Sequence, residues 1–319
     1  MFSHNRLFIK LMSKLDFNEE SSKHKRRVMR LGAHKRRTLT VLDYLNNEIS
    51  SHKLSASQFF RYSYCHNHLL FHHYPALEKT KLHEVMHCDI HLLCPMCAIR
   101  RAARSVMKYE EKYRELLSRN PVLKLYYVVL TVKNMENLEE GFEHLEKSMR
   151  LLVKRRREAI SYVNGKSKAS AYAAGSVFAG VAAGAYSFEV KRGANSGLWH
   201  PHVNLLLLSD KQIRTPQLMN EWYSITEDSY IVDCQRVRDS KQSFVEIFKY
   251  ALKFSDMTPA DTYHTWETLR TRRLCGSFGD FRGLEITKAD EHVEPSEEFI
   301  ELFYRFEAKR YAPSDKNRL

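Results

Sequence analysis

The chain has 319 residues, of which 51 are Lys or Arg and 38 are Asp or Glu, so its formal net charge is +13. A hydrophobic share of 43% excludes a chain that is disordered throughout. No apolar run reaches the roughly 18 residues that a membrane-spanning helix needs. The excess of positive charge favours a polyanionic partner, most often nucleic acid, although charge that serves only solubility is the alternative.

The first 40 residues show no sustained hydrophobic period and are predicted to form a flexible or loosely helical basic arm. They contain 11 basic and three acidic side chains, and so supply eight of the 13 excess positive charges. The same stretch has no apolar core followed by a small-residue cleavage site, so no secretory signal is apparent. We therefore expect a cytoplasmic protein.

Residues 41–119 are predicted to form a helical and zinc-binding region. Apolar side chains indicate a helix over 41–64, and a second helix is predicted over 98–119, where Asn120-Pro121 ends it. The intervening segment, residues 65–97, is rich in histidine and cysteine and is predicted to be irregular.

Four of the six cysteines fall within this segment, which indicates metal binding in a reducing compartment. Cys94 and Cys97 form a CxxC knuckle whose sulfurs can reach one tetrahedral Zn²⁺, and Cys65 and Cys88 supply two further thiols. We therefore predict a structural zinc site. The alternatives are reduced cysteines that merely lie close together and a redox-active CxxC, although no βαβ pattern frames the motif. The rival ligands are the histidines of the same segment, namely His66, His68, His83, His87 and His91.

Three arginines, Arg100, Arg101 and Arg104, follow the knuckle immediately on the predicted helix. The zinc segment is therefore expected to direct cations toward phosphate groups.

Strands and helices are predicted to follow one another from residue 120 onwards, with a hairpin-like loop at 191–197 between two strands. This order predicts an α+β fold with a mainly antiparallel sheet flanked by helices. In chain order the predicted elements are strand 122–132, helix 137–159, strands 176–190 and 198–208, helix 216–223, strand 229–234 and helix 241–254.

Three polar residues, His200, His202 and Asn204, alternate along a predicted strand, so their side chains face the same way. Glu189 ends the preceding predicted strand and could add a carboxylate ligand from that neighbouring strand. Nitrogen and oxygen ligands together suit Mg²⁺ or Mn²⁺ better than a thiophilic ion. The pattern alone is weak, because most pairs of alternating histidines are ordinary surface or core residues.

Glu246 and Tyr250 are four residues apart in a predicted helix, which places both side chains on one helical face. A phenol ordinarily titrates at about pH 10, so it needs nearby cations or a metal-bound phosphate to act as a nucleophile. Lys249 and Lys253 flank the tyrosine and would supply that charge. The alternative is an ordinary helix with a buried tyrosine and a surface glutamate.

Six segments of the chain form a recognisable series: CPMC with the arginines that follow it, VVLTVKN, FEVKRG, WHPHVNLLLL, FVEIFKYALKF and RRLCGSFGDFRG. Their order and content resemble the rolling-circle replication initiator (Rep) proteins of small plasmids, which belong to the HUH endonuclease superfamily. The resemblance is to the single-tyrosine branch with an N-terminal zinc motif, and it covers about residues 65–283.

The resemblance implies an HUH-type palm over residues 120–285 and a C-terminal tail over residues 286–319. It assigns Tyr250 as the nucleophile that attacks a DNA phosphate, leaving a 5′-phosphotyrosine and a free 3′-OH primer. It assigns Glu246 as the carboxylate that activates water at termination. Lys249 and Lys253 would bind the DNA near the cut.

The resemblance also implies that a catalytic Mg²⁺ or Mn²⁺ is held by His200, His202, Asn204 and Glu189. The family usually has a third histidine at the position of Asn204. An asparagine offers a neutral oxygen ligand, which is compatible with Mg²⁺ or Mn²⁺ and weaker than imidazole for softer metals.

The implied activity is nicking and joining of origin DNA, both duplex and single-stranded, with the zinc segment and the basic arm recognising the origin. No complete phosphate-binding loop is present, because Ile160 stands where the first glycine before Gly165-Lys166-Ser167 would be. A host helicase and a DNA polymerase are therefore expected partners, and a membrane is not. A zinc-dependent DNA-binding regulator that has lost catalysis is the alternative function.

Overall fold

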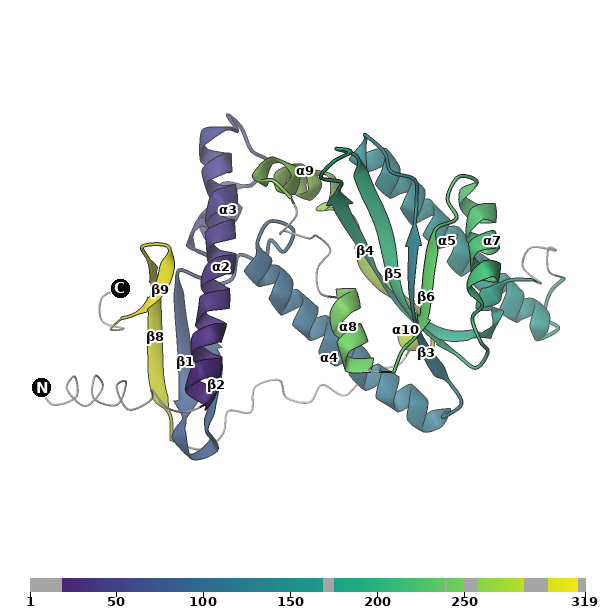
Figure 1. Cartoon of the computed structure of the whole chain (residues 1–319), viewed down its shortest axis with the longest axis horizontal. Helices are drawn as coiled ribbons and strands as arrows, with labels where there is room; N and C mark the ends of the chain where they lie inside the picture. Colours follow the sequence, from purple (N-terminus) through teal and green to yellow (C-terminus); the bar gives the residue numbers. More distant parts are fainter. Residues whose placement is uncertain (1–18, 169–174, 239, 249–256, 284–297, 315–319) are drawn as a thin grey trace, which may run out of the picture. The chain divides into compact units, whose positions relative to one another are not determined.

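The computed structural model of the chain describes residues 19–168, 175–238, 240–248, 257–283 and 298–314 (Figure 1). The chain divides into two compact units, one of residues 1–97 with 289–319 and the other of residues 98–288. The described fold is α+β, with antiparallel sheets flanked by helices, as predicted from the sequence. In these parts of the chain no helix is both long and apolar enough to cross a bilayer.

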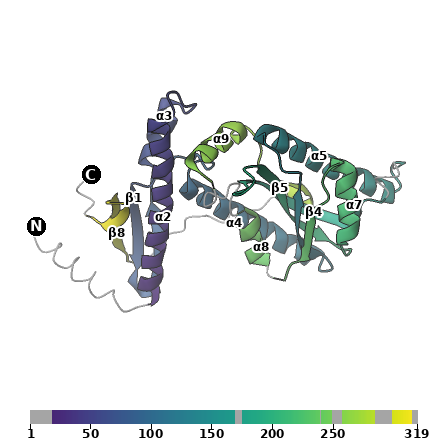
Figure 2. The same cartoon turned by 45° about the horizontal axis from the view of Figure 1, so that its top comes forward.

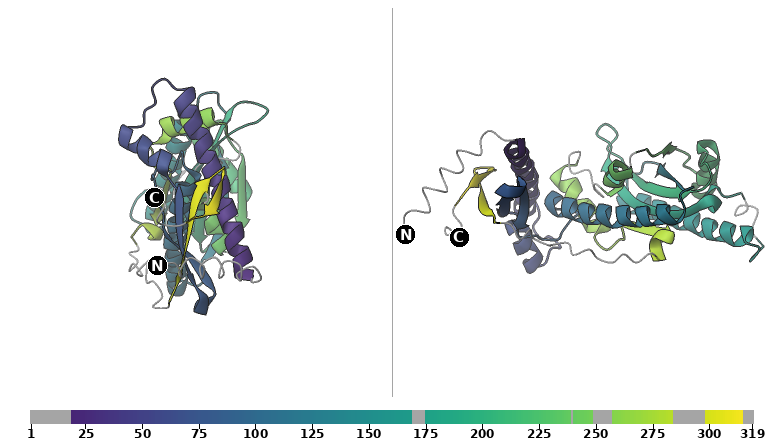
Figure 3. Two further views of the ribbon diagram at one scale, coloured as in Figure 1. Left: turned by 90° about the vertical axis from the view of Figure 1, so that its left-hand side faces the viewer. Right: turned by 90° about the horizontal axis from the view of Figure 1, so that it is seen from below.

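The first unit contains a four-stranded antiparallel sheet. Its described elements are α2 (Glu19–Asn47), α3 (Ala56–Tyr64), β1 (His68–Tyr74), the short 3-10 helix η2 (Pro75–Leu77), β2 (Lys79–Glu84), β8 (Ile300–Glu307) and β9 (Arg310–Pro313). The strand order is β2-β1-β8-β9, and α2 runs across one face of the sheet (Figure 3). Val28 of α2 packs there on a buried cluster that includes Phe71, Leu302 and Tyr311.

Much of the predicted basic arm is an ordered helix, because residues 19–40 belong to α2. Val28, Lys35 and Thr38 are buried along one side of this helix. Basic side chains fill most of the remaining positions, so the narrow buried stripe does not stand out as a hydrophobic period. Residues 1–18 lie outside the described residues.

The first unit combines residues 1–97 with residues 289–319, whereas the sequence predicted a zinc-binding region over 41–119 and a separate C-terminal tail over 286–319. Residues 65–97, expected to be irregular, contain β1 and β2, and the expected tail contains β8 and β9. β8 pairs antiparallel with β1, from His68 opposite Arg305 to His73 opposite Ile300. No local pattern reveals this pairing, since its partners are far apart in the chain and the histidines of β1 obscure its apolar character.

The second unit contains a five-stranded antiparallel sheet in the order β6-β3-β5-β4-β7. The predicted strands and helices of this part are present within a few residues of their expected limits, and the predicted helix 241–254 is described as far as Phe248. The elements are α4 (Pro95–Arg119, of this unit from residue 98), β3 (Lys124–Thr131), α5 (Leu138–Val163), η3 (Val177–Gly180), β4 (Val181–Arg192), β5 (Trp199–Ser209), α7 (Thr215–Thr226), β6 (Val232–Arg236), α8 (Ser240–Phe248), α9 (Pro259–Leu269), β7 (Cys275–Gly279) and α10 (Asp280–Gly283).

Helices cover both faces of this sheet (Figures 1 and 2). On one face, Leu206 of β5 belongs to a core cluster with Phe244 of α8 and with apolar residues of α4. On the other face, the Phe142 ring of α5 meets the Phe188 ring of β4 edge-on, with centroids 5.3 Å apart. Successive side chains of a strand point to opposite faces, so both sides of the central strands are apolar where helices cover them.

Candidate functional site

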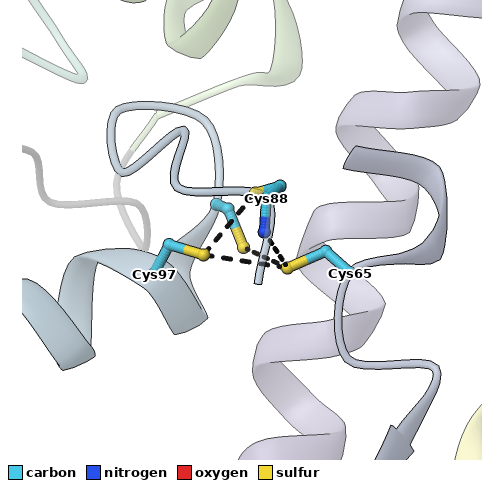
Figure 4. A group of neighbouring side chains, drawn as sticks. Cys65, Cys88 and Cys97 are labelled. Atoms are coloured by element: carbon cyan, nitrogen blue, oxygen red, sulfur yellow. Dashed lines mark hydrogen bonds between the residues drawn. The ribbon is translucent and has the colours of Figure 1, made fainter. Parts of the chain in front are cut away.

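The four cysteines predicted to bind zinc gather in one buried cluster (Figure 4). Cys65 caps the end of α3, Cys88 lies in the segment after β2, and Cys97 lies in the first turn of α4, with Cys94 just before it. Their Sγ atoms all lie within 4.8 Å of one another. The CxxC spacing brings two sulfurs together locally, whereas the fold of the first unit supplies the other two.

The sulfur positions fit a tetrahedral zinc site. Four thiolates bound to one Zn²⁺ at about 2.3 Å place their sulfurs about 3.8 Å apart. The Sγ of Cys65 lies 3.7 Å from those of both Cys94 and Cys97, and the Sγ of Cys88 lies 3.5 Å from that of Cys97. The neighbouring thiols raise the pKa of Cys88, so four thiolates can gather here only around a cation. The cluster could therefore hold a structural zinc.

A buried lysine beside the thiols escaped the sequence analysis, because it stands in the predicted arm. Lys35 is 1% exposed, and its Nζ donates a hydrogen bond of 2.7 Å to the backbone oxygen of Cys65. Burial lowers the pKa of Lys35 from its usual value, and the thiols of Cys65 and Cys94 oppose that shift. A cation at this position partly offsets the negative charge of a zinc-tetrathiolate centre.

Two of the rival histidines lie against the cysteine cluster. His66 places its Nδ1 2.9 Å from the Sγ of Cys65. The His66 and His87 rings meet edge-on with centroids 4.7 Å apart, and the two side chains form a second potential metal-ligating group with Cys97. Among the described residues, His68, His83 and His91 belong to neither group. His66 and His87 therefore lie next to the site, whereas the four sulfurs can supply all four ligands of a tetrahedral zinc.

The three predicted DNA-binding arginines lie in the N-terminal half of α4. Arg101 and Arg104 are exposed and Arg100 is half-buried. The Arg101 Nη2 lies 3.7 Å from the Cys275 Sγ, near enough for a weak hydrogen bond to sulfur. Solvent can therefore reach these cations.

A polar row crosses the end of the five-stranded sheet, formed by His202, Asn204 and Glu189. Glu189 of β4 stands directly opposite His202 of β5 in the antiparallel register. The Oε2 of Glu189 lies 3.3 Å from the Nε2 of His202 and accepts a hydrogen bond of 3.0 Å from the Nδ2 of Asn204. All three residues are less than a tenth exposed. The alternation predicted from the sequence thus brings these residues together on one face.

Tyr127 of β3 extends the polar row and was missed by the sequence analysis. Its hydroxyl donates a hydrogen bond of 2.9 Å to the Oδ1 of Asn204. Burial raises the pKa of Tyr127 well above its usual value, and the Glu246 and Glu189 carboxylates add to that shift. The phenol therefore stays protonated and remains a donor. Knowledge of the strand pairing would have indicated this contact, because β3 lies beside β5 and Tyr127 shares a face of the sheet with Asn204.

His200 begins the same row, but its ring hydrogen-bonds outside it. The Nδ1 of His200 lies 2.5 Å from the Oδ1 of Asn134, a residue that precedes α5. The His200 and His202 rings are tilted, with centroids 5.3 Å apart. Asn134 is thus a further neighbour of the row that no local motif indicated.

α8 lies on the face of the sheet that carries the polar row. Phe244 and Ile247 bury this helix in the core, while Glu246 stays exposed. The effect of Glu246 on the pKa of Tyr127 indicates that its carboxylate lies near the row. The predicted nucleophile Tyr250 lies outside the described residues, as do Lys249 and Lys253.

Comparison with known proteins gave one match. Residues 79–302 match the family model described as replication protein. This range contains three of the four clustered cysteines, the polar row and α8, and leaves Cys65 outside. No curated protein and no solved structure matches the chain.

Proposed function

The chain belongs to the replication protein family, and from this premise we propose that it initiates rolling-circle replication of a plasmid by nicking origin DNA. The observation that carries the proposal is the buried contact between Glu189 and His202, on the face of the sheet where α8 lies. A rolling-circle initiator must open one strand to provide a primer. The polar row, the helix α8 and Tyr250, which follows Phe248 by two residues in the chain, would provide the groups for that step.

In the proposed reaction the Tyr250 oxygen attacks the phosphorus of the scissile phosphodiester. A bond forms between that oxygen and phosphorus as the phenol gives up its proton. The bond to the 3′ oxygen breaks, and the departing oxygen takes up a proton to become the 3′-OH primer. The 5′-phosphotyrosine link conserves a phosphodiester, so a later attack by a 3′-OH can rejoin the DNA. Lys249 and Lys253 would bind the adjoining phosphates.

Glu246 is the proposed base for termination. Its carboxylate is exposed on α8, four residues before Tyr250. On a continuous helix that spacing is about one turn. It can therefore take a proton from water that hydrolyses the phosphotyrosine link once the strand has been displaced.

Glu189, His202 and His200 are the residues that would hold a catalytic Mg²⁺ or Mn²⁺. Their donor atoms are nitrogen and carboxylate oxygen, which suit these ions. When bound, the ion would neutralise charge on the scissile phosphate. The amide oxygen of Asn204 accepts a hydrogen bond of 2.9 Å from the Tyr127 hydroxyl, and its second lone pair could join the ligands.

The buried cysteine cluster is the proposed site of a structural zinc. We propose that the zinc region and the basic N-terminal residues bind duplex DNA beside the origin, with Arg100, Arg101 and Arg104 contacting phosphates. A host helicase would unwind the duplex and a host polymerase would extend the primer, in the cytoplasm.

A transfer assay tests the nucleophile directly. Single-stranded oligonucleotides that tile the parent replicon carry a label at the 3′ end, because the downstream fragment is the one that becomes attached. With Mn²⁺ the wild-type chain should acquire this label covalently, and Tyr250→Phe should abolish the adduct because phenylalanine has no oxygen nucleophile. Tyr223→Phe, at a tyrosine that is 51% exposed, is the matched control and should label normally.

Two results would contradict the assignment. One is an adduct that persists in Tyr250→Phe, and the other is the absence of any adduct across the whole tiling series. The second result, together with zinc-dependent binding to one segment of the replicon, would favour a DNA-binding regulator without catalysis.

A further inference from the structure

A cavity with the character of an anion site lies at the outer edge of the second unit. It has a volume of about 590 Å³ and is formed where the edge strand β6 meets the start of α7, two elements that lie side by side in Figure 1. This size is in the range of pockets that bind small ligands. Its lining includes Tyr126, Arg214, Thr215, Pro216, Cys234 and Arg236.

Two arginines bring positive charge to this cavity. Arg214 and Arg236 are exposed, and neither guanidinium makes an ion pair or a hydrogen bond with another residue in the described part of the chain. None of the described lining residues is acidic. Two guanidinium groups without carboxylate partners, facing one cavity, can each donate two parallel hydrogen bonds to an oxyanion.

A tyrosine in the lining of the cavity points to a ligand independently of the charge. Tyr126 is only 5% exposed, yet it lines the cavity and its hydroxyl has no hydrogen-bond partner among the described residues. The hydroxyl is therefore open to the cavity and can donate a hydrogen bond to a bound acceptor.

The start of α7 supplies backbone donors at the same place. This helix of 12 residues begins at Thr215, and its N-cap residue Arg214 makes no side-chain capping hydrogen bond. The amide groups of a first helical turn lack partners within the helix and favour an anion. Burial, and then Asp233, raise the pKa of the Cys234 thiol to about 11, so this lining side chain is neutral at pH 7 and does not repel an anion.

We propose that this cavity binds a phosphate group, carried either by the DNA backbone or by a free nucleotide. The proposal goes beyond the nicking activity, because Tyr126 and Tyr127 are successive residues of β3 and point to opposite faces of the sheet. The phosphate cavity therefore lies on the face away from the polar row, so a strand held there passes outside the nicking site.

The test compares the full-length chain with its Arg214→Gln/Arg236→Gln variant. One arm measures binding of deoxyadenosine monophosphate by calorimetry. The other measures binding of a labelled 20-nucleotide single strand and of its duplex by fluorescence anisotropy at several salt concentrations. In at least one arm the double variant should bind about ten-fold more weakly, and Tyr126→Phe should bind several-fold more weakly.

The control is Arg238→Gln. Arg238 lies two residues beyond the end of β6 and does not line the cavity, so this variant removes one positive charge from outside the cavity. It is compared with Arg236→Gln, which removes the same charge inside the cavity. A loss confined to the nucleotide arm identifies a nucleotide site, and a loss confined to the DNA arm identifies a backbone contact. Unchanged affinity in both arms, or an equal loss in Arg238→Gln, would overturn the proposal.

This result is separate from the test of nicking. Both arginines and Tyr126 lie away from the polar row, so the cavity variants should still form the covalent adduct on a short single strand. Thermal unfolding of each variant verifies that the fold is retained. If the wild-type chain forms no adduct, the phosphate-binding measurements can still be interpreted. If the cavity binds no phosphate, the adduct assay can likewise still be interpreted.

Discussion

At the scale of single residues, one uncharged side chain sets the orientation of the polar row. Tyr127 donates to the oxygen of Asn204, which leaves the amide hydrogens of Asn204 for Glu189. With Tyr127→Phe the amide keeps only its hydrogen bond to Glu189, so its orientation is held less firmly. We expect kcat for cleavage of a single strand to fall about ten-fold with little change in KM, because the loss concerns alignment and not DNA binding.

The matched control for this prediction is Tyr126→Phe, next along β3 on the opposite face of the sheet. It should cleave a short oligonucleotide at the wild-type rate. A wild-type kcat in Tyr127→Phe would contradict the positioning role, and an equal fall in Tyr126→Phe would indicate a general weakening of β3.

A second residue-scale prediction separates nicking from hydrolysis. Glu246→Ala should retain covalent labelling but slow hydrolytic release of the adduct by about 10²-fold, the usual range for loss of a general base. Pulse labelling followed by a chase with unlabelled strand measures both steps. Glu246→Gln keeps the size of the side chain and should behave the same. If both steps fall together, Glu246 has a structural role instead, although its exposure argues against one.

The sequence predicted only part of each of the two sites. The spacing of Cys94 and Cys97 and the alternation of His202 and Asn204 are local patterns, and both predicted which side chains share a site. Lys35 and Tyr127 reach those sites through helix packing and strand register, which depend on distant parts of the chain. Single-residue patterns carry no information about such contacts.

At the scale of elements, the sequence predicted the second unit well and the first unit poorly. β3 and the second half of β5 are apolar runs with clear limits, and these properties are visible locally. β1 carries three histidines in seven residues, and its partner β8 comes from the other end of the chain. The period of α2 is masked by basic side chains, so a helix that packs on the sheet looks like an arm.

The pairing of β4 with β7 depends on one glycine, and this gives an element-scale prediction. Gly279 has φ of +62°, and a Cβ there would lie 2.1 Å from the backbone oxygen of Ala182. That oxygen also accepts a hydrogen bond from Arg156. Gly279→Ala should lower the free energy of unfolding by about 2–4 kcal/mol, since strain and a backbone clash add. Urea unfolding measures this loss.

Gly165→Ala is the control for the backbone strain alone. Gly165 has φ of +69°, but a Cβ added there would have no atom within 4 Å. This variant should lose only about 1 kcal/mol. Similar losses in the two variants would show that the clash with Ala182 relaxes and that the β4–β7 contact tolerates a side chain.

At the scale of the whole molecule, only part of the net charge of +13 is available to contact DNA. Part of it holds the first unit together: Lys35 donates to the Cys65 backbone, and Arg36 donates to the backbone oxygen of Lys309 at 2.9 Å. Arg27 likewise donates to the backbone oxygen of Thr80 at 3.3 Å. These cations are tied to the protein, so the number of phosphates that the chain contacts is smaller than its net charge implies.

Zinc removal is the prediction that concerns both units. Purified protein should contain about one Zn²⁺ per chain, and a chelator should unfold the first unit, because α3, α4 and the segment after β2 all meet at the four sulfurs. The second unit has its own core and should keep its slow hydrogen exchange. Cys94→Ala should reproduce the chelated state, whereas Cys234→Ala, at a cysteine outside the cluster, should keep the metal. Metal-free protein with an intact first unit would show that packing alone holds the four thiols together, and exchange lost throughout the chain would show that the units unfold as one.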